Sequence, residues 1–427
     1  MEISVLHSLF LTCASVSIDT RKIDNNCMFF ALKGERFDAN AFAVEALEKG
    51  AAYVIIDNKN YFVDHRTVLV QNSLETLQEL AQYHRNYLGL PIISLTGSNG
   101  KTTTKELIYA VLSKKYRIKA TVGNLNNHIG VPLTLLTFTE ETEIGIVEMG
   151  ANHQKEIAFL CDLTKPDFGY ITNFGKAHLE GFGGVEGVIK GKSELYDYLK
   201  SNEKVAFVNF DDAIQVERTE DLQRFGFSQK KSSGIVFVSE VSANPFVQMR
   251  INDVEVKSYL IGDYNANNIA AAFTIGNYFA VESGQMKEAI EAYESNNNRS
   301  QVIQKTGLKI ILDAYNANPS SMEAAIYNFE RLSDARKVMI LGDMFELGVE
   351  SIEEHKAIVQ LVADLDFDVV YFIGHDFYAN KIIKKNLLFF EDYNQFVKVF
   401  KVDSVQDSVL LIKGSRGMAL ERLLEVL

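Results

Sequence analysis

Short apolar runs alternate with helical patterns along most of the chain, and they divide it into three blocks. In the first block, the runs "CMFFAL" and "AAYVIID" flank the helical pattern "ANAFAVEALEKG", which predicts a small α/β unit. A leucine-rich helical pattern over residues 73–90 then stops at Pro91, because proline cannot continue a helix. We therefore predict a first domain over residues 1–90.

The second block begins at Ile92 with the patterns of a strand, a glycine loop and a helix. Apolar runs separated by helical stretches follow, namely "EIGIVEM", "FGYITNF" and "KVAFVNF". This order is typical of a mostly parallel, doubly wound sheet. Three alternating segments predict an antiparallel appendage, namely "SGIVFVSEV", "PFVQMRI" and "VEVKSYLI". The asparagine-rich "ESNNNRS" predicts a linker, so the second domain is predicted over residues 91–297.

The third block again repeats strand and helix patterns. Its apolar runs are "LKIILD", "KVMILG", "VVYFIG" and "VLLIKG". They predict a smaller Rossmann-like domain over residues 298–427. The predicted fold class is thus α/β with three domains: a small N-terminal domain, a central domain with a mostly parallel, doubly wound sheet, and the Rossmann-like C-terminal domain.

The amino-acid composition restricts the expected binding partners and the expected cellular compartment. The chain has 43 Lys and Arg residues against 56 Asp and Glu residues, a net charge of −13. Such a surface repels nucleic acid and anionic membranes, so an anionic ligand needs a local basic pocket. Membrane insertion is not expected, because no run of about 18 apolar residues occurs and the N-terminus carries Glu2 where a secretory signal needs basic residues. We expect a packed helix there. Cys13, Cys27 and Cys161 form no CxxC pair, which argues against disulfides or a zinc cluster and favours a reducing, cytoplasmic location.

The segment "IISLTGSNGKTTTKEL" carries specific chemistry. A strand, a glycine turn and a helix direct backbone N–H groups and the positive end of a helix dipole at one point, which suits a triphosphate. Lys101 is expected to reach the β- and γ-phosphates and the Thr102 hydroxyl to ligate Mg²⁺. The alternative is a chance turn. The expected ATP-binding residues of this loop are Gly97, Ser98, Asn99, Gly100, Lys101, Thr102 and Thr103.

Further polar residues follow the predicted strands of the second block. Glu148 ends a buried run, where it could ligate Mg²⁺ or cap a neighbouring helix, and the sequence leaves both roles open. His178 follows the next run, and a lone histidine is more often a satisfied polar residue than a ligand. Lys190 and Lys192 lie two positions apart on a helix, so at most one faces a site, and solvated side chains are the simplest interpretation.

The short loop, in which the pattern G-[ST]-x-G-K-T spans Gly97 to Thr102, resembles that of the Mur ligases and their folylpolyglutamate synthetase relatives. The resemblance implies an ATP-dependent ligase that forms amide bonds with two Mg²⁺ ions. It implies that His178 ligates the second Mg²⁺ and that Lys192 reacts with carbon dioxide to form a carbamate, a carboxylate-like ligand. Such a carbamate makes sense only beside metal ions in a desolvated pocket. The implied catalytic residues are Lys101, Glu148, His178 and Lys192, and the implied metal ligands are Thr102, Glu148, His178 and Lys192.

The same resemblance assigns the rest of the nucleotide site. "GDYNANNIAAA" contains Asn265 and Asn268 on one face of a helix start, where capping is the ordinary role of asparagine. The family's matching segment implies that Asn268 contacts adenine. Arg299 matches an arginine near the phosphates, and Asp313 matches the ribose-binding aspartate. The resemblance also implies a monomer whose third domain swings closed.

Four further segments resemble one member of the family, the ligase that adds D-alanyl-D-alanine to a UDP-N-acetylmuramoyl-tripeptide. They include "IDTRKIDNNCMFFALKGERFDANAFAVEALEKGA", "GNLNNHIGVPLTLL", "DAYNANPSSMEAA" with "LGDMFELGVESIEEH", and "LLIKGSRGMALE". The resemblance implies an acyl-phosphate route to the pentapeptide precursor of peptidoglycan. The rivals are another Mur-type or folylpolyglutamate-type ligase and a non-catalytic, nucleotide-gated binding protein.

A long UDP-sugar-peptide needs an anchor remote from the chemistry, and the first block is the candidate. Its expected contacts are Thr20, Arg21, Lys33 and Asp38, for which ordinary surface polarity is the alternative. The residues expected to face the muramoyl-peptide are Asn126, Asn127 and His128. Those expected to orient either the dipeptide amine or the nucleotide are Asn316, Asn318 and Ser321. The role of the basic loop "KGSRGM" stays open.

Overall fold

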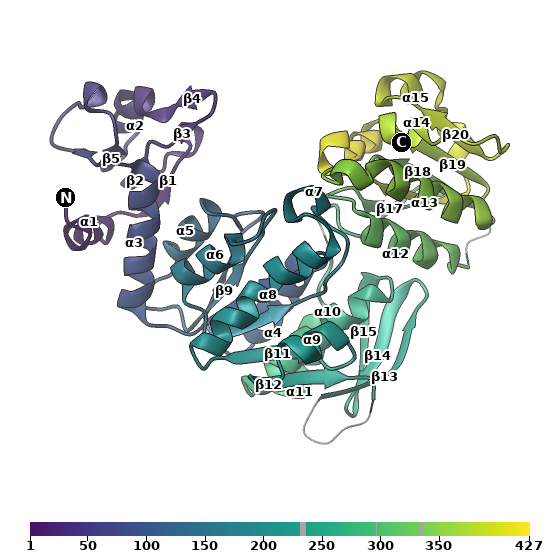
Figure 1. The fold of residues 1–427 in the computed structure, drawn as a ribbon, viewed down its shortest axis with the longest axis horizontal. Coiled ribbons are helices and arrows are strands. Elements are labelled where there is room, and N and C mark those ends of the chain that lie inside the picture. Colours follow the sequence, from purple (N-terminus) through teal and green to yellow (C-terminus); the bar gives the residue numbers. More distant parts are fainter. Residues whose placement is uncertain (231–235, 296, 334–335) are drawn as a thin grey trace.

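Each of the three blocks forms its own β-sheet. The first block lies at one end of the central block and the third block at the other, at the upper left and upper right of Figure 1. The computed structural model describes residues 1–230, 236–295, 297–333 and 336–427. The three-domain α/β fold class expected from the sequence patterns is confirmed.

The first sheet is small and parallel, with strand order β1-β2-β5-β6. Its strands are β1 (Ser15–Ser17), β2 (Cys27–Phe30), β5 (Tyr53–Ile56) and β6 (Thr67–Leu69), a hairpin adds β3 (Lys33–Gly34) and β4 (Phe37–Asp38), and the helices are α1 (Ile3–Phe10), α2 (Ala43–Glu48) and α3 (Ser73–Leu88). The N-terminal α1 is the packed helix expected there, because it buries Leu6, His7 and Phe10.

The long helix α3 joins the first block to the central one (Figure 1). It begins where the Asn72 side chain accepts hydrogen bonds from the backbone N–H groups of Leu74 and Glu75. It ends at Leu88, and the next residue, Gly89, has a φ of 61° that suits glycine; Leu90 and the helix-breaking Pro91 follow.

The central sheet has, among the described residues, the strand order β15-β14-β13-β12-β11-β10-β7-β9-β8. Its strands are β7 (Ile92–Thr96), β8 (Ile118–Ala120), β9 (Ile144–Glu148), β10 (Phe168–Ile171), β11 (Val205–Asn209), β12 (Gln223–Ser228), β13 (Val236–Ala243), β14 (Phe246–Ile251) and β15 (Val254–Ile261). Its helices are α4 (Lys101–Leu112), α5 (Gly130–Leu135), α6 (Glu156–Thr164), α7 (Leu179–Phe182), α8 (Val185–Ser201), α9 (Ala213–Arg218), α10 (Tyr264–Tyr278) and α11 (Ser283–Glu291).

The three alternating segments form the expected antiparallel appendage, and it is joined to the central sheet. β13 pairs in parallel with β12, so the antiparallel pairs β13–β14 and β14–β15 extend the central sheet itself. Alternation predicted the hairpins, but it carries no information about which strand the first of them would join. Residues 233–235 of the first expected segment, and residue 296 of the expected linker, lie outside the described residues.

Both faces of the central sheet are covered. Ile92 and Val147 pack into the core that contains residues of α5, α6 and α8, whereas Ile93 and Ile146 pack into the core formed with α4, α10 and α11. Burial on both faces explains why the strands appear in the sequence as unbroken apolar runs. No helix in the described part of the chain is long and apolar enough to cross a membrane.

Within the described residues the third sheet has the order β16-β17-β21-β18-β19-β20, in which only the β16–β17 pair is antiparallel. Its strands are β16 (Gln301–Lys305), β17 (Leu308–Asp313), β18 (Lys337–Gly342), β19 (Val369–Ile373), β20 (Leu387–Phe390) and β21 (Ser408–Lys413), and its helices are α12 (Pro319–Glu330), α13 (Ser351–Asp364), α14 (His375–Ala379) and α15 (Tyr393–Val399). The four apolar runs predicted β17, β18, β19 and β21, whereas the edge strands β16 and β20 were not predicted.

Candidate active site

Three neighbouring strands of the central sheet end at one place. Because the order is β10-β7-β9 and all pairs are parallel, the residues after each strand meet at the same edge. The phosphate loop follows β7, Glu148 ends β9 and Asn173 follows β10. Crevices at the carboxyl ends of such strands are where open α/β sheets bind ligands. A cavity of about 980 Å³ opens at this edge, lined by residues of the central and third blocks.

The phosphate loop is fastened to the segment after β10. Asn173 accepts a hydrogen bond from the Ser98 N–H through its carbonyl (3.1 Å) and one from the Asn99 N–H through Oδ1 (3.0 Å). Two positions require glycine: Gly97 has φ 142° and a Cβ there would lie 2.0 Å from Thr172 Oγ1, and Gly100 has φ 79°. The loop is therefore held in shape before any ligand contacts it.

Lys101 begins α4 and folds back over the loop. Its Nζ donates to the carbonyl oxygens of Gly97 (2.7 Å) and Ser98 (3.3 Å). Desolvation lowers its pKa, an effect that Glu148 opposes and Arg299 reinforces. Phosphate oxygens would offer this ammonium group a stronger partner than the neutral carbonyls.

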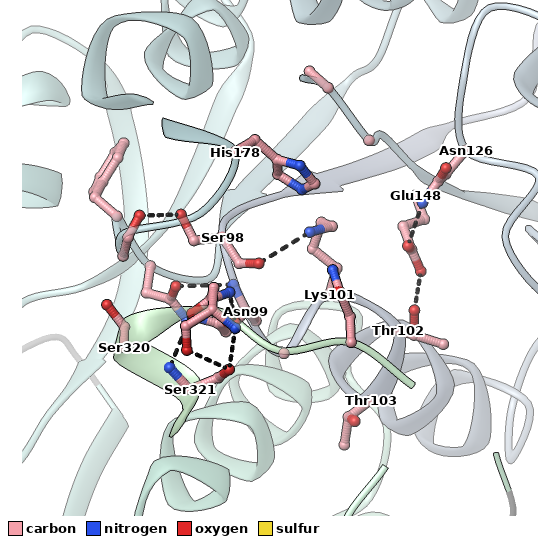
Figure 2. A pocket seen from close by; sticks show the side chains of 18 of the residues that line it. Ser98, Asn99, Lys101, Thr102, Thr103, Asn126, Glu148, His178, Ser320 and Ser321 are labelled. Atoms are coloured by element: carbon pink, nitrogen blue, oxygen red, sulfur yellow. Dashed lines mark hydrogen bonds between the residues drawn. The ribbon is translucent and has the colours of Figure 1, made fainter. Parts of the chain in front are cut away.

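Glu148 is buried and holds two side-chain contacts. Thr102 donates through Oγ1 to Oε2 of Glu148 (2.8 Å), and Asn126 donates through Nδ2 to Oε1 (2.8 Å), as Figure 2 shows. No hydrogen bond from a helix N–H to this carboxylate is seen within the described residues, so the geometry favours a ligand over a helix cap. A hydroxyl beside a carboxylate is an oxygen donor set that Mg²⁺ accepts.

His178 lines the same cavity. In the view of Figure 2 it lies above Lys101, whereas Glu148 lies to the right of Lys101. Its Nδ1 lies 2.5 Å from Oε2 of Glu346 in the third block. This contact holds the pKa of Glu346 below its ordinary value, against the opposing effect of burial. Nε2 is then the imidazole nitrogen left for a cation.

Lys192 is buried and is not among the residues that line the cavity, whereas Lys190 is exposed, in agreement with the expectation that at most one of the two faces the site. Its Nζ donates to the Ala151 carbonyl (3.1 Å) and lies 4.9 Å from the centre of the Phe182 ring. Desolvation lowers the pKa of Lys192 well below its ordinary value, and the nearby charge of Lys101 lowers it further. The solvated interpretation is therefore wrong for Lys192.

Through Asn268, the asparagines of α10 contact α4, the helix that follows the phosphate loop. Asn268 accepts from Thr104 Oγ1 (3.0 Å) and donates to Asn265 Oδ1 (2.7 Å), while Asn265 donates to the Ile261 carbonyl (2.7 Å). Both asparagines also line the cavity. Neither side chain caps α10, so the capping alternative was wrong.

The third block closes the cavity with a cation and an ion pair. The guanidinium carbon of Arg299 lies 3.8 Å from the centre of the Tyr315 ring. Asp313 accepts from the Ser300 N–H (3.1 Å) and pairs with Nζ of the buried Lys413 at 2.5 Å. Arg299 and Lys413 thus provide local positive charge in the cavity of an acidic chain, which favours the binding of an anion.

An amide pair joins the phosphate loop to the third block. Asn318 donates through Nδ2 to Asn99 Oδ1 (2.7 Å), and Asn99 donates back to Asn318 Oδ1 (3.4 Å). Asn318 also caps α12 in a capping box with Ser321. Asn318 and Ser321 therefore have structural partners in addition to their place in the cavity wall.

The family is decided by comparison along the whole chain. Three family models match in succession: the Mur ligase family catalytic domain at residues 12–85, the Mur ligase middle domain at residues 95–276, and the Mur ligase glutamate ligase domain at residues 298–416. The UDP-N-acetylmuramoyl-tripeptide–D-alanyl-D-alanine ligase of Bacillus subtilis is 34% identical over 422 residues, which are 96% of this chain and 92% of that protein. The chain belongs to the Mur ligase family.

Solved Mur ligases share the arrangement of the three blocks. A MurF structure from Acinetobacter baumannii matches with a TM-score of 0.87 at 29% identity, covering 99% of this chain and 98% of that one. A MurF ligase from Thermotoga maritima, solved in complex with ADP, matches with a TM-score of 0.82 at 29% identity and covers 97% of each chain.

The substrate candidates of this Mur ligase fall into two groups. The residues that line the cavity are Asn126, Asn127, His128, Asn316, Asn318 and Ser321. Outside it lie the first-block candidates Thr20, Arg21, Lys33 and Asp38. The Arg21 guanidinium donates two hydrogen bonds to Asp19 (2.9 and 2.8 Å), Lys33 pairs with Asp57 at 2.8 Å, and Asp38 caps the 3-10 helix Ala39–Phe42.

Several cavity residues of this Mur ligase were not predicted. Asn173, Tyr264 and Tyr315 line the cavity, yet none was proposed as a contact; Lys413 also lines it as the first residue of the loop "KGSRGM", whose role was left open. Asn173 lies near the end of the predicted run "FGYITNF", just as Glu148 lies near the end of "EIGIVEM", so the same signal pointed to both residues. Lys413 ends β21 and begins the loop "KGSRGM", so the sequence pointed to it, but its pairing with Asp313 was not predicted.

The capping of α12 supports a stability prediction. Replacing Asn318 by alanine removes the cap and the amide pair to Asn99, so we expect a loss of about 1 kcal/mol in the free energy of unfolding. Thermal unfolding of Asn318→Ala and Asn99→Ala measures this. Asn99→Ala removes only the amide pair and should cost less; equal melting temperatures for both variants and the parent would contradict the cap's contribution.

Proposed function

We propose that this Mur ligase uses ATP to join D-alanyl-D-alanine to UDP-N-acetylmuramoyl-tripeptide, which makes the pentapeptide precursor of peptidoglycan. One observation carries the proposal: similarity to the Bacillus subtilis enzyme of that name extends over 96% of the chain, including the first block that no nucleotide site requires. The cavity supports it, because it brings the phosphate loop and the third block to one place.

The need for ATP follows from the chemistry of the bond. A carboxylate is a poor electrophile, so the terminal carboxylate of the tripeptide attacks the γ-phosphorus and releases ADP, giving an acyl phosphate. The amine of D-alanyl-D-alanine then attacks the acyl carbon, and the tetrahedral intermediate expels phosphate to leave the amide. The protein's task is to position both substrates and to offset negative charge on the transferred group.

Two cations of the chain suit that second task. Lys101 stands at the start of α4 on the phosphate loop, and Arg299 lines the opposite wall of the cavity. Tyr315 holds the Arg299 guanidinium by stacking, which leaves its N–H groups for phosphate oxygens. We assign Asn268 to the adenine and Asp313, which pairs with Lys413, to the ribose; both residues line the cavity, which supports the assignment.

The oxygen donors present fit Mg²⁺ only in part. Thr102 and Glu148 supply two donors and His178 lies in the same cavity, but the described residues contain no group of three His, Cys, Asp or Glu side chains able to hold a metal. Phosphate oxygens and one further protein ligand would complete the sites. When bound, Mg²⁺ neutralises the phosphates and polarises the γ-phosphoryl group.

Lys192 is our choice for the further ligand, as a carbamate. Burial and the nearby Lys101 both favour its neutral amine, which is the form that attacks carbon dioxide. The carbamate replaces a buried cation by an anion that faces Lys101 and the Mg²⁺ ions, so the site offsets its charge.

Remote binding of the UDP end is assigned to the first block. Lys33 and Arg21 are the cations proposed to grip the diphosphate, and their present partners Asp57 and Asp19 are carboxylates that a phosphate can replace. Thr20 and Asp38 would add hydrogen bonds. One chain suffices for catalysis in this scheme, because both walls of the cavity come from the same chain.

The dipeptide dependence of phosphate release tests the function. With UDP-N-acetylmuramoyl-tripeptide and ATP fixed, we expect sustained phosphate release only when D-alanyl-D-alanine is added, with the pentapeptide detected by mass spectrometry. Release that follows a single amino acid or a folate would identify another ligase of the superfamily. Hydrolysis indifferent to every acceptor would point to a nucleotide-gated binding protein.

A further inference from the structure

His178 stands where the central and third blocks touch. Its Nδ1 lies 2.5 Å from Oε2 of Glu346, a residue of the loop between β18 and α13. The two atoms are at ion-pair distance, and Nδ1 forms no hydrogen bond within the described residues. The His178 side chain is 20% exposed and that of Glu346 50% exposed. The partner of this imidazole therefore comes from a different block than the strand that positions it.

Contacts on both sides of His178 fix the same register between the blocks. Before it, the Lys176 N–H donates to Ser320 Oγ (2.9 Å), and Lys176 Nζ pairs with Glu354 at 2.5 Å. After it, the Glu180 N–H donates to the carbonyl of Glu346 (3.3 Å). The segment 176–180 is thus docked on the third block along its whole length.

The loop that carries Glu346 is held from within its own block. The Met344 N–H donates to Nε2 of the buried His355 (3.0 Å), and the Phe345 N–H donates to Ser415 Oγ (2.8 Å). Glu346 has φ 63° and His178 has φ 55°, a backbone region that residues other than glycine seldom adopt. Left-handed conformations at such residues cluster at functional sites, where the surrounding structure maintains them.

A purely structural role does not explain the contact between His178 and Glu346. Half-exposed ion pairs contribute only about 0–1 kcal/mol to stability, too little to explain left-handed backbone at both partners. A carboxylate on the second nitrogen of a metal-binding histidine, by contrast, fixes the tautomer and direction of the ring.

We propose that Glu346 is a positioning residue: its carboxylate holds Nδ1 of His178, so that Nε2 is presented to the Mg²⁺ site only when the third block is docked. This rests on the proposed function for the metal role of His178. Docking of the third block would then affect metal binding, because this block lines one wall of the cavity and also orients His178, the metal ligand on the other wall.

Metal affinity measured without turnover tests the proposal. Mn²⁺ replaces Mg²⁺ as a paramagnetic probe, and its binding to the full-length protein with ADP is titrated by electron paramagnetic resonance. We expect Glu346→Gln to weaken Mn²⁺ binding by about 10- to 100-fold, the usual effect of losing such a partner. Glu346→Asp should restore part of the affinity. Glu353→Gln is the matched control, because Glu353 is exposed on the adjoining α13 and its change of charge is the same.

A double variant separates orientation from general damage. If Glu346 acts through the imidazole, adding Glu346→Gln to His178→Ala should weaken Mn²⁺ binding no further. Equal affinity of Glu346→Gln and the parent, or full additivity in the double variant, would overturn the proposal. A parent protein that binds no Mn²⁺ with ADP would instead count against the metal site of the proposed function.

Discussion

Replacing Lys101 by alanine is expected to lower pentapeptide formation by about 10³-fold, the upper range for removing one group that stabilises transferred charge. The ammonium group bonds only to carbonyls of its own loop among the described residues, and it would exchange them for the β- and γ-phosphates. The loss should therefore fall on turnover and on nucleotide binding, with little effect on the fold.

Initial rates of phosphate and pentapeptide formation, together with thermal unfolding, measure this loss. Lys119→Ala is the control, because Lys119 is exposed on the edge strand β8 and its replacement removes the same charge. We expect unchanged melting temperatures for both variants and normal rates for the control. Near-parental rates with Lys101→Ala would remove the phosphate-loop assignment.

Replacing Lys192 by alanine is expected to lower the rate by about 10²-fold or more, because the proposed carbamate would no longer help offset charge in the site. The exposed Lys190, two positions away on the same helix α8, provides the matched control Lys190→Ala. Short carboxylates such as acetate or formate should enter the space left by the side chain and restore part of the Lys192→Ala rate.

The carbamate can also be tested in the parent protein. Removing carbon dioxide and bicarbonate should lower its rate reversibly, and isotopically labelled bicarbonate should give a carbamate signal by nuclear magnetic resonance that Lys192→Ala lacks. Parental activity in Lys192→Ala, with no response to carboxylates, would exclude the carbamate. A simple structural role for the lysine would leave the rate insensitive to bicarbonate.

Local sequence patterns determined the secondary structure and the positions of several site residues. A strand, a glycine loop and a helix must place Lys101 and Thr102 at a helix start, because the spacing between them is covalent. Unbroken apolar runs likewise required strands covered on both faces, which put Glu148 at a carboxyl edge. Helical spacing required that one of Lys190 and Lys192 turn away from the site.

Contacts between distant segments were decided only by the tertiary structure. Asn99 and Asn318 are 219 positions apart, and nothing in either segment specifies the other. The order β10-β7-β9 brought Asn173 onto the phosphate loop, and the pairing of β17 with β21 brought Lys413 to Asp313. Periodicity encodes which face of an element is buried, whereas the choice of neighbour is set by packing of whole faces. The partner of His178 belongs to this second class, because it depends on how the third block docks.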